Sequence, residues 1–427
     1  MTTLDRTKAP AVRPLSDISL VPPVVTSLAN GITLTTVRAG DQPLVRLVVM
    51  SEGGRYDFSP ISAIALMGEA MREGAGGMTG EQIADIIDYS GARLGSRVSD
   101  HHNGIDLIVL NSRLADLLPV VRAMIETPDF DERPVDIIRR RQSSNRAVQL
   151  TKVGVRATTL SKQMIAGKDH IAGSLDTPEQ ILAVTADDLR RCHRQTFGSA
   201  QLHVYMAGNY DDVLLRSVTE MFESLPARTG KSPVTVTPYV PEPARRINDP
   251  RPDAQQSAVS MTLPAIPRTH PDYIALRLTL MGLGGYFGSR LMSNIREDKG
   301  LTYGIGASLQ GSFEGAFASI DAQCDASYVD QVIAESMAEV RSLVDNPIDG
   351  EELNRLKLKA WSTLASTADS PMSMIDYHIT GLVVGTPADY FEQQLRAIDG
   401  LTADTVSRMA STYLLADSWR IAVSGPF

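Results

Sequence analysis

The sequence predicts an α+β protein made of two homologous domains, each a β-sheet covered on one face by helices. Three observations support this prediction: a segment repeated at the end of each half, a proline-rich stretch between the halves, and strand-like runs that flank helical patterns. At 427 residues the chain is also longer than one ordinary hydrophobic core requires.

The clearest repeat lies at the end of each half. The first half ends with "VTADDLRRCHRQTFGSAQLHVYMAG" and the second with "LTADTVSRMASTYLLADSWRIAVSG". At one constant offset, Thr185 aligns with Thr402 and Gly208 aligns with Gly425. In each copy we expect a helix capped by the threonine, followed by an apolar strand that ends at the glycine.

Two further segments match in the same order. The stretch "AIALMGEAM" corresponds to "YIALRLTLMG", and "EQIADIIDYSGARLG" corresponds to "SRLMSNIREDKGLTYG". The second alignment pairs Gly91 with Gly300 and Gly95 with Gly304. Three matches in one order, with nearly constant offsets, indicate an internal duplication.

A proline-rich stretch separates the two copies. Residues 227–253 contain six of the 24 prolines, and each proline fixes φ and removes a backbone donor. We therefore predict a semi-extended linker that lies outside both cores. The domains are then expected at residues 1–226 and 254–427.

The first domain has recognisable local signals. The runs "NGITLTTV" and "LVRLVVM" predict strands. A capping-box pattern at Thr79 and Gln82 predicts the start of a helix, and Gly91 stands where that helix should end. Helices are expected at about residues 60–74, 80–90, 113–127, 132–150 and 154–166.

Charge and composition exclude several classes of protein. The net charge of −9 argues against non-specific nucleic-acid binding, and no stretch approaches the roughly 20 apolar residues of a membrane span. Two cysteines, Cys192 and Cys324, can form neither a disulfide framework nor a thiolate zinc site. Without an apolar signal region at the N-terminus, we expect a cytoplasmic protein, or a periplasmic one if an export signal was trimmed.

A glycine-rich stretch, "GLGGYFGSRLMSNIREDKGLTY", covers residues 282–303. A phosphate loop would need Lys-[Ser/Thr] after its last glycine, but Gly288 is followed by serine and arginine. A nucleotide-dependent enzyme is therefore an alternative that the pattern does not favour. Two interpretations stay open: a helix–loop–helix connection that uses the conformational freedom of glycine, or a loop whose bare backbone faces a ligand.

Arg296 and Tyr303 follow the glycines, the first late on an expected helix and the second on the next strand. A guanidinium beside a phenol suits the binding of peptide carbonyls or of a developing oxyanion. The alternative is a surface arginine paired with Glu297 or Asp298, and a half-buried tyrosine that packs a strand. Residue chemistry alone favours this alternative.

The stretch "GYFGSRLMSNIREDKGLTYGIGAS" resembles the signature of the pitrilysin/insulinase zinc peptidases, which include mitochondrial processing peptidase and paired bacterial subunits. The segments "LANGITLTTV", "EGAGGMTGEQIADIIDYSGARLGS" and "ETPDFDE" match the first domain of that family. The resemblance covers almost the whole chain. It implies two homologous domains of the pitrilysin/LuxS-like metallohydrolase-like fold.

The resemblance also implies that this chain has lost its zinc site. Catalytic members carry His-x-x-Glu-His, and the matching positions here are Ala65, Gly68 and Glu69. The third ligand should fall near Ser144 or Asn145, where no carboxylate stands. The chain is therefore expected to hold no metal or other cofactor and to be inactive alone, with zinc in a catalytic partner.

Arg296 and Tyr303 match the family's substrate-contacting pair, which in heterodimeric bacterial members can act across the subunit interface. The resemblance thus favours a functional pair, in a non-catalytic subunit that contributes peptide binding and oxyanion stabilisation to a partner's zinc site. The partner would be a zinc-binding homologue in a heterodimer, or a second copy in a homodimer. Unfolded peptide would be held as an added β-strand, near glycines with open backbone: Gly282, Gly284, Gly285 and Gly288.

A different class of function is also compatible with the sequence. Within the wider family, core subunits of respiratory complexes serve as scaffolds. The present chain could likewise be an interaction protein with no role in peptide hydrolysis, in which case Arg296 and Tyr303 would be dispensable.

Overall fold

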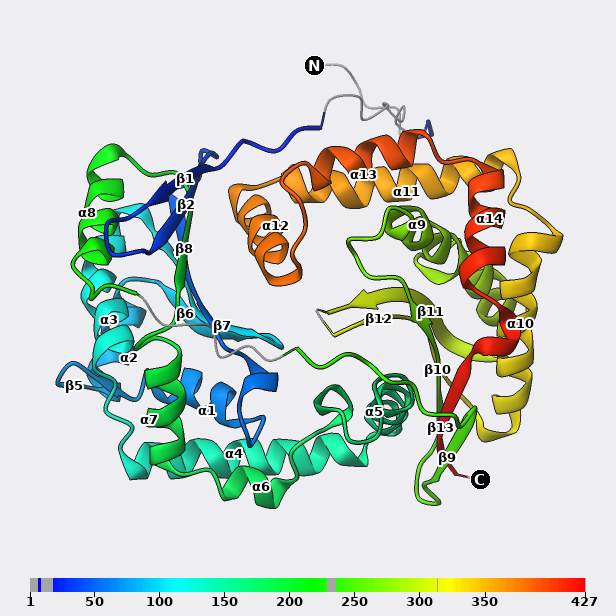
Figure 1. Ribbon diagram of the computed structural model, residues 1–427, viewed down its shortest axis with the longest axis horizontal. Coiled ribbons are helices and arrows are strands. Elements are labelled where there is room, and N and C mark those ends of the chain that lie inside the picture. The colour runs from blue at the N-terminus through cyan, green and yellow to red at the C-terminus, as the bar shows by residue number, and fades with distance from the viewer. Residues whose placement is uncertain (1–6, 9–17, 229–235, 313, 427) are drawn as a thin grey trace.

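A computed structural model describes residues 7–8, 18–228, 236–312 and 314–426. Helices surround two large β-sheets, one in each half of the chain, as Figure 1 shows. The α+β class predicted from the sequence is confirmed. Within the described residues, no helix is both long enough and apolar enough to cross a membrane.

The first sheet has six strands in the order β1-β2-β8-β3-β7-β6. Its hydrophobic core lies between the sheet and the helices α1 (Ala63–Ala70), α3 (Leu114–Glu126), α7 (Ala186–Gln195) and α8 (Asp212–Glu223). A separate two-stranded ribbon, β4 (Gly74–Ala75) with β5 (Met78–Thr79), precedes α2. The strands of the sheet are β1 (Val24–Ser27), β2 (Thr33–Arg38), β3 (Leu44–Glu52), β6 (Arg93–Val98), β7 (His102–Leu110) and β8 (Leu202–Gly208).

The second sheet has five strands in the order β11-β12-β10-β13-β9. Without β1, the first sheet has the same order and the same directions, with one parallel pair in each sheet, β2 with β8 and β9 with β13. A duplicated domain would produce this agreement, and the duplication itself stays a prediction. The strands are β9 (Arg246–Pro250), β10 (Ser257–Ala265), β11 (Thr302–Gly311), β12 (Ala316–Cys324) and β13 (Arg420–Gly425).

The helices expected in the first half are present within a few residues of the predicted bounds. They are α1 (Ala63–Ala70), α2 (Gly80–Tyr89), α3 (Leu114–Glu126), α4 (Glu132–Thr151), α5 (Val153–Ala166), α6 (Pro178–Leu182), α7 (Ala186–Gln195) and α8 (Asp212–Glu223). The second half contains α9 (Tyr273–Gly284), a π-helix (Met292–Asp298), α10 (Val329–Asp345), α11 (Gly350–Ala368), α12 (Pro371–Val384), α13 (Tyr390–Asp399) and α14 (Ala403–Tyr413). Short 3₁₀ turns lie at Arg55–Asp57, Asn111–Arg113, Ile171–Gly173, Ala326–Tyr328 and Ala416–Ser418.

The predicted helix ends are confirmed by their hydrogen bonds. The backbone N–H of Gln82 donates to the Thr79 hydroxyl at the start of α2, and the Gln82 side chain accepts from the Thr79 N–H. Gly91 follows α2 with φ +59°, a conformation that favours glycine. Thr185 and Thr402 cap α7 and α14 in the same way, each through its side-chain oxygen.

Each half contributes one helix to the sheet of the other half. Helix α12 packs Met374, Ile375 and Ile379 against Val37 and Val48 of the first sheet. Helix α5 lies on the second sheet, where the hydroxyls of its Ser161 and of Ser260 are 3.0 Å apart. The sequence predicted one helix-covered face per sheet, and these crossing helices meet the other face.

The proline-rich segment is more ordered than the sequence suggested. Its residues 246–250 form β9, which pairs in parallel with β13, so this part belongs to the second sheet. The strand alternates between exposed and half-buried positions, and it therefore lacks the apolar run that would mark a strand. Residues 229–235 of the predicted linker lie outside the described residues. The predicted domain boundaries stay a prediction.

Candidate functional site

Arg296 lies beside two aromatic rings near the start of β11. It belongs to the π-helix that follows α9, and Gly300, with φ +63°, turns the chain into β11, which contains Tyr303. The guanidinium carbon of Arg296 is 4.7 Å from the ring centroid of Phe287 and 5.6 Å from that of Tyr303. The expected positions, on a helix and on the following strand, are confirmed.

This cation–aromatic cluster of Phe287, Arg296 and Tyr303 faces solvent. Tyr303 is 90% exposed and Phe287 is 59% exposed. Among the described residues, Arg296 forms no ion pair with Glu297 or Asp298, so the alternative of a paired arginine and a half-buried tyrosine does not describe the structure. Sequence analysis missed Phe287, although an aromatic residue between glycines in "GYFG" is a recognisable signal.

The four glycines assigned to substrate binding fall into two groups. Gly282 and Gly284 are buried in α9, where an added Cβ would lie 3.2 Å from Leu356 and 2.5 Å from the backbone N of Ala307. These two glycines therefore let α9 approach α11 and β11, and a substrate-binding role does not fit them. Gly285 and Gly288 are exposed and stay candidates for contact with substrate.

Tyr303 also marks the free edge of the second sheet. Strand β11 stands last in the strand order and pairs only with β12 among the strands of the described chain. An unpaired edge offers alternating N–H and C=O groups to an added strand. The cation–aromatic cluster therefore lies at the beginning of a strand that can accept a peptide.

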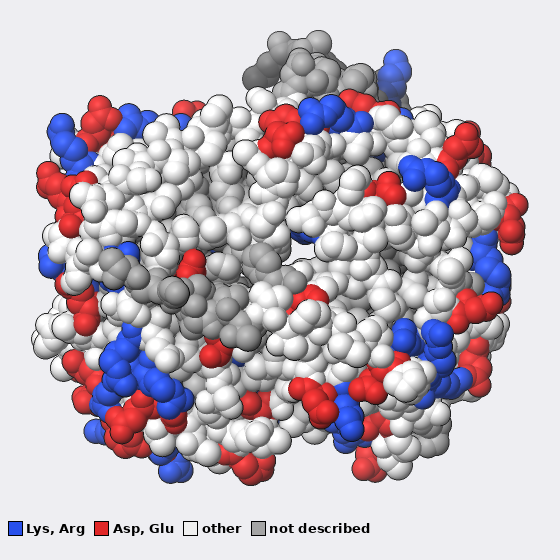
Figure 2. Space-filling model, viewed as in Figure 1, with Lys and Arg blue, Asp and Glu red and all other residues white. Residues whose placement is uncertain are grey.

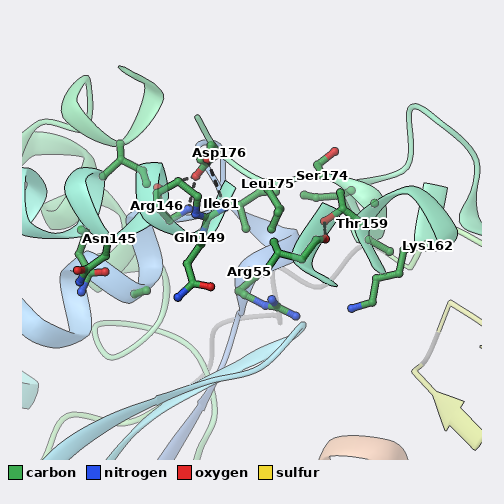
Figure 3. Close-up of a pocket in the computed structure, with 18 of the residues that line it drawn as sticks. Arg55, Ile61, Asn145, Arg146, Gln149, Thr159, Lys162, Ser174, Leu175 and Asp176 are labelled. Atoms are coloured by element: carbon green, nitrogen blue, oxygen red, sulfur yellow. Dashed lines mark hydrogen bonds between the residues drawn. The ribbon is translucent and has the colours of Figure 1, made fainter. Parts of the chain in front are cut away.

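The positions that match the family's zinc ligands also come together in the fold. Ala65 and Glu69 of α1 and Asn145 of α4 line one cavity of about 930 Å³, part of which is drawn in Figure 3. Ser144 is not among the lining residues. The structure thus places the three positions as the family resemblance implies, but with side chains of a different chemistry.

These residues do not fit a zinc ion. An added Cβ at Gly68 would lie 2.7 Å from Cβ of Ser96, so α1 packs too closely on β6 for any side chain there. Glu69 accepts hydrogen bonds from Arg141 Nη2 and Gln142 Nε2, both at 2.5 Å. In the described ranges, no group of three or more His, Cys, Asp or Glu residues could hold a metal ion.

A buried histidine joins the two halves near this cavity. The ring of His101 contacts Asp57 of the first half and Glu314 of the second, and all three side chains are almost inaccessible to solvent. Burial opposes protonation of His101, but hydrogen bonds to the two carboxylates outweigh it and raise the pKa to about 9. His101 is therefore a charged link between the halves at neutral pH.

Known proteins with similar sequences or folds point to one peptidase family. Residues 183–359 match the family model described as the peptidase M16 inactive domain. This part of the chain is similar to the peptidase M16 inactive domain. The resemblance to the pitrilysin/insulinase peptidases is confirmed at this level, and an inactive, peptidase-like protein agrees with the missing zinc ligands.

Two curated relatives illustrate how distant the sequence similarity of this chain to known proteins is. It is 23% identical over 286 residues to an uncharacterized zinc protease of Streptomyces coelicolor. It is 22% identical over 275 residues to the non-peptidase homolog YmxG of Helicobacter pylori. These matches cover 64% and 61% of this chain, and they span only 61% and 60% of the two relatives.

The fold is shared more completely than the sequence. A crystal structure of a peptidase M16 inactive domain from Pseudomonas fluorescens superimposes with a TM-score of 0.83 at 21% identity. The superposition covers 95% of this chain and 98% of the other. The chain therefore shares the fold of that protein over nearly its whole length.

Proposed function

We propose that this M16 protein is a non-catalytic subunit that contributes Arg296 and Tyr303 to the active site of a zinc-bearing homologue. The observation that carries the proposal is the exposed cation–aromatic cluster at the start of an unpaired edge strand. This cluster coexists with a helix α1 whose Ala65, Gly68 and Glu69 cannot form a zinc site. A homodimer would contain two such cavities, so hydrolysis requires a heterodimer.

The cluster suits a role in holding and polarising a peptide. The guanidinium of Arg296 carries several N–H donors, and Phe287 and Tyr303 restrict it between their rings. The exposed phenol of Tyr303 adds a hydroxyl donor. Donors fixed in advance stabilise the oxyanion that develops on the scissile carbonyl.

The edge of β11 accounts for the class of substrate. An unfolded peptide can pair with β11 through main-chain hydrogen bonds, which depend little on the peptide's sequence. On the face seen in Figure 2, acidic and basic side chains alternate around the rim, an arrangement without the basic footprint of a nucleic-acid-binding protein. We therefore propose unfolded peptide as the substrate.

Two alternatives are less well supported. A scaffold would give no reason for an arginine held between two exposed aromatic rings. A nucleotide-dependent enzyme would need glycines that leave room for phosphate. Leu356 and Ala307 instead occupy the space next to Gly282 and Gly284.

A cytoplasmic location stays a prediction, with the periplasm as the alternative. Both cysteines are buried free thiols.

Reconstitution tests the proposal. This chain, a homologue from the same genome that carries His-x-x-Glu-His, and their mixture are each assayed with an unstructured fluorogenic peptide. We expect substantial hydrolysis only from the mixture, and no stoichiometric zinc in this chain purified alone. Peptidase activity or tight one-to-one zinc in the lone chain would contradict the proposal. A scaffold role would leave the mixture's activity unchanged after Arg296→Ala and Tyr303→Ala.

A further inference from the structure

Three cationic side chains line the cavity at the expected zinc position. Arg55 comes from the 3₁₀ turn after β3, Arg146 from α4 and Lys162 from α5. Figure 3 shows the charged ends of Arg55 and Lys162 directed toward the same part of the cavity. The cavity that contains the positions matching the family's zinc ligands therefore also contains three cationic side chains.

Two of these cations form no direct ion pair with a carboxylate of the described chain. Within the described residues, Lys162 forms no hydrogen bond or ion pair, and Arg146 donates only to the backbone carbonyl of Asp176, at 3.3 Å. Arg55 is paired with Asp100, which lies outside the cavity lining. The cavity thus has unused capacity for an anion.

The two acidic residues of the lining do not neutralise these cations. Glu69 is held by Arg141 and Gln142, whose side chains donate to both of its carboxylate oxygens. Asp176 accepts hydrogen bonds from the backbone N–H and the hydroxyl of Ser62, both at 2.5 Å. Each acid therefore has its own partners within the protein.

The environment of Lys162 favours an added negative charge. Burial lowers the pKa of Lys162 and the nearby positive charge of Arg55 lowers it further, while the charges of Asp100 and Asp321 offset only part of this shift. Two like charges in a partly desolvated cavity repel each other, and an anion between them would convert this repulsion into two attractive contacts. A carboxylate, with two oxygens, can accept hydrogen bonds from both groups.

The rest of the lining indicates what carries the carboxylate. Ile61, Leu66 and Leu175 are apolar, and the side-chain amides of Asn145 and Gln149 form no hydrogen bond within the described chain. A cavity of about 930 Å³ is large enough for a short peptide segment. Apolar surface suits a peptide side chain, and free amides suit its backbone.

We propose that this cavity binds a peptide by its carboxylate, held between Arg55 and Lys162. The carboxylate can come from the peptide's C-terminus or from an acidic side chain. The inference rests on the proposed function in one respect, that the ligand is a peptide. It concerns a separate site from Arg296 and Tyr303 and needs no partner subunit.

Calorimetric titration of the isolated full chain tests the proposal. The probes are an N-acetylated tripeptide with a free C-terminal phenylalanine, its amidated form, an amidated tripeptide with an internal glutamate, and inorganic phosphate. We expect the free acid to bind at least about 10-fold more tightly than the amidated form. Binding of the glutamate peptide alone would also support the proposal and would identify the side chain as the source. Equal binding of all three peptides, binding of phosphate only, or no binding would overturn it.

Variants of Lys162 locate the site. Lys162→Met should weaken binding of the carboxylate peptide at least about 10-fold, and Lys162→Arg should restore most of it. The matched control is Lys168→Met, because Lys168 is exposed and lies outside the cavity. If Lys162→Met and Lys168→Met have the same effect, the assignment is wrong. Since no partner is used, failure here leaves the role of Arg296 and Tyr303 untouched.

Discussion

Arg46 of β3 and Asp376 of α12 join the two halves of the chain, with Nη1 of the arginine 2.6 Å from the aspartate carboxylate. The same guanidinium donates two hydrogen bonds to Asp106 of β7, at 2.9 and 2.6 Å. Arg46 is only 8% exposed, and the two carboxylates together raise its pKa further above its usual value. The crossing helix α12 is thus fixed to the first sheet by a buried charge as well as by apolar contacts.

Removal of Arg46 should therefore destabilise the protein strongly. Arg46→Met leaves Asp106 and Asp376 facing each other with only Arg97 between them, and we expect a loss of about 3 kcal/mol or more in the free energy of unfolding. Urea denaturation measures this loss. The control is Arg122→Met, which removes an exposed helical pair with Glu126 and should cost less than about 1 kcal/mol. Equal losses in the two variants would contradict the account.

Gly68 should tolerate no side chain. Gly68→Ala places a Cβ 2.7 Å from Cβ of Ser96, and we expect a destabilisation of about 1–3 kcal/mol from overpacking. Adding Ser96→Gly removes the clashing atom and should recover much of the loss. Gly95→Ala is the matched control, because its added Cβ meets no atom within 4 Å. A neutral Gly68→Ala variant would show that α1 can move away from β6, and a restored zinc motif would then be feasible.

The link through His101 should make stability depend on pH. The folded pKa of about 9 lies above the unfolded value of 6.5, so the stabilisation is complete below about pH 6.5 and disappears as the pH rises through about 9. We expect the stability advantage of the wild type over Glu314→Gln to be large at pH 6 and to shrink by pH 9.5. His102 and His193, whose pKa values are lowered to about 4 chiefly by burial, titrate below this pH range. An advantage independent of pH would show that His101 is not protonated in the folded protein.

Local structure could be predicted from the sequence because short-range chemistry determines it. The capping residues Thr79, Thr185 and Thr402 and the helix end at Gly91 are fixed by hydrogen bonds and φ angles that involve only neighbouring residues. The exchange of α5 and α12 between the halves could not be predicted in this way. It depends on contacts such as that of Arg46 with Asp376, which are 330 residues apart in sequence.

In the candidate site, too, local positions could be predicted from the sequence, whereas features that depend on tertiary packing could not. The positions of Arg296 and Tyr303 on a helix and the next strand followed from the sequence, and the resemblance placed Ala65, Glu69 and Asn145 around one site. Whether a glycine faces solvent or a neighbouring helix depends on tertiary packing, so the buried state of Gly284 was not predictable. The three cations of the cavity could not be predicted for a similar reason, because Arg55 is about 90 residues from Arg146 and more than 100 from Lys162 in the sequence.

The most direct test of the central claim is the turnover number of the reconstituted heterodimer after Tyr303→Phe. This change keeps the ring beside Arg296 and removes only the hydroxyl, and stability should not change because Tyr303 is 90% exposed. We expect kcat to fall about 100-fold with little change in KM, as for the loss of one oxyanion donor. Tyr89→Phe, at another exposed tyrosine, should leave kcat unchanged. An unchanged kcat in Tyr303→Phe would contradict the claim that this chain takes part in catalysis.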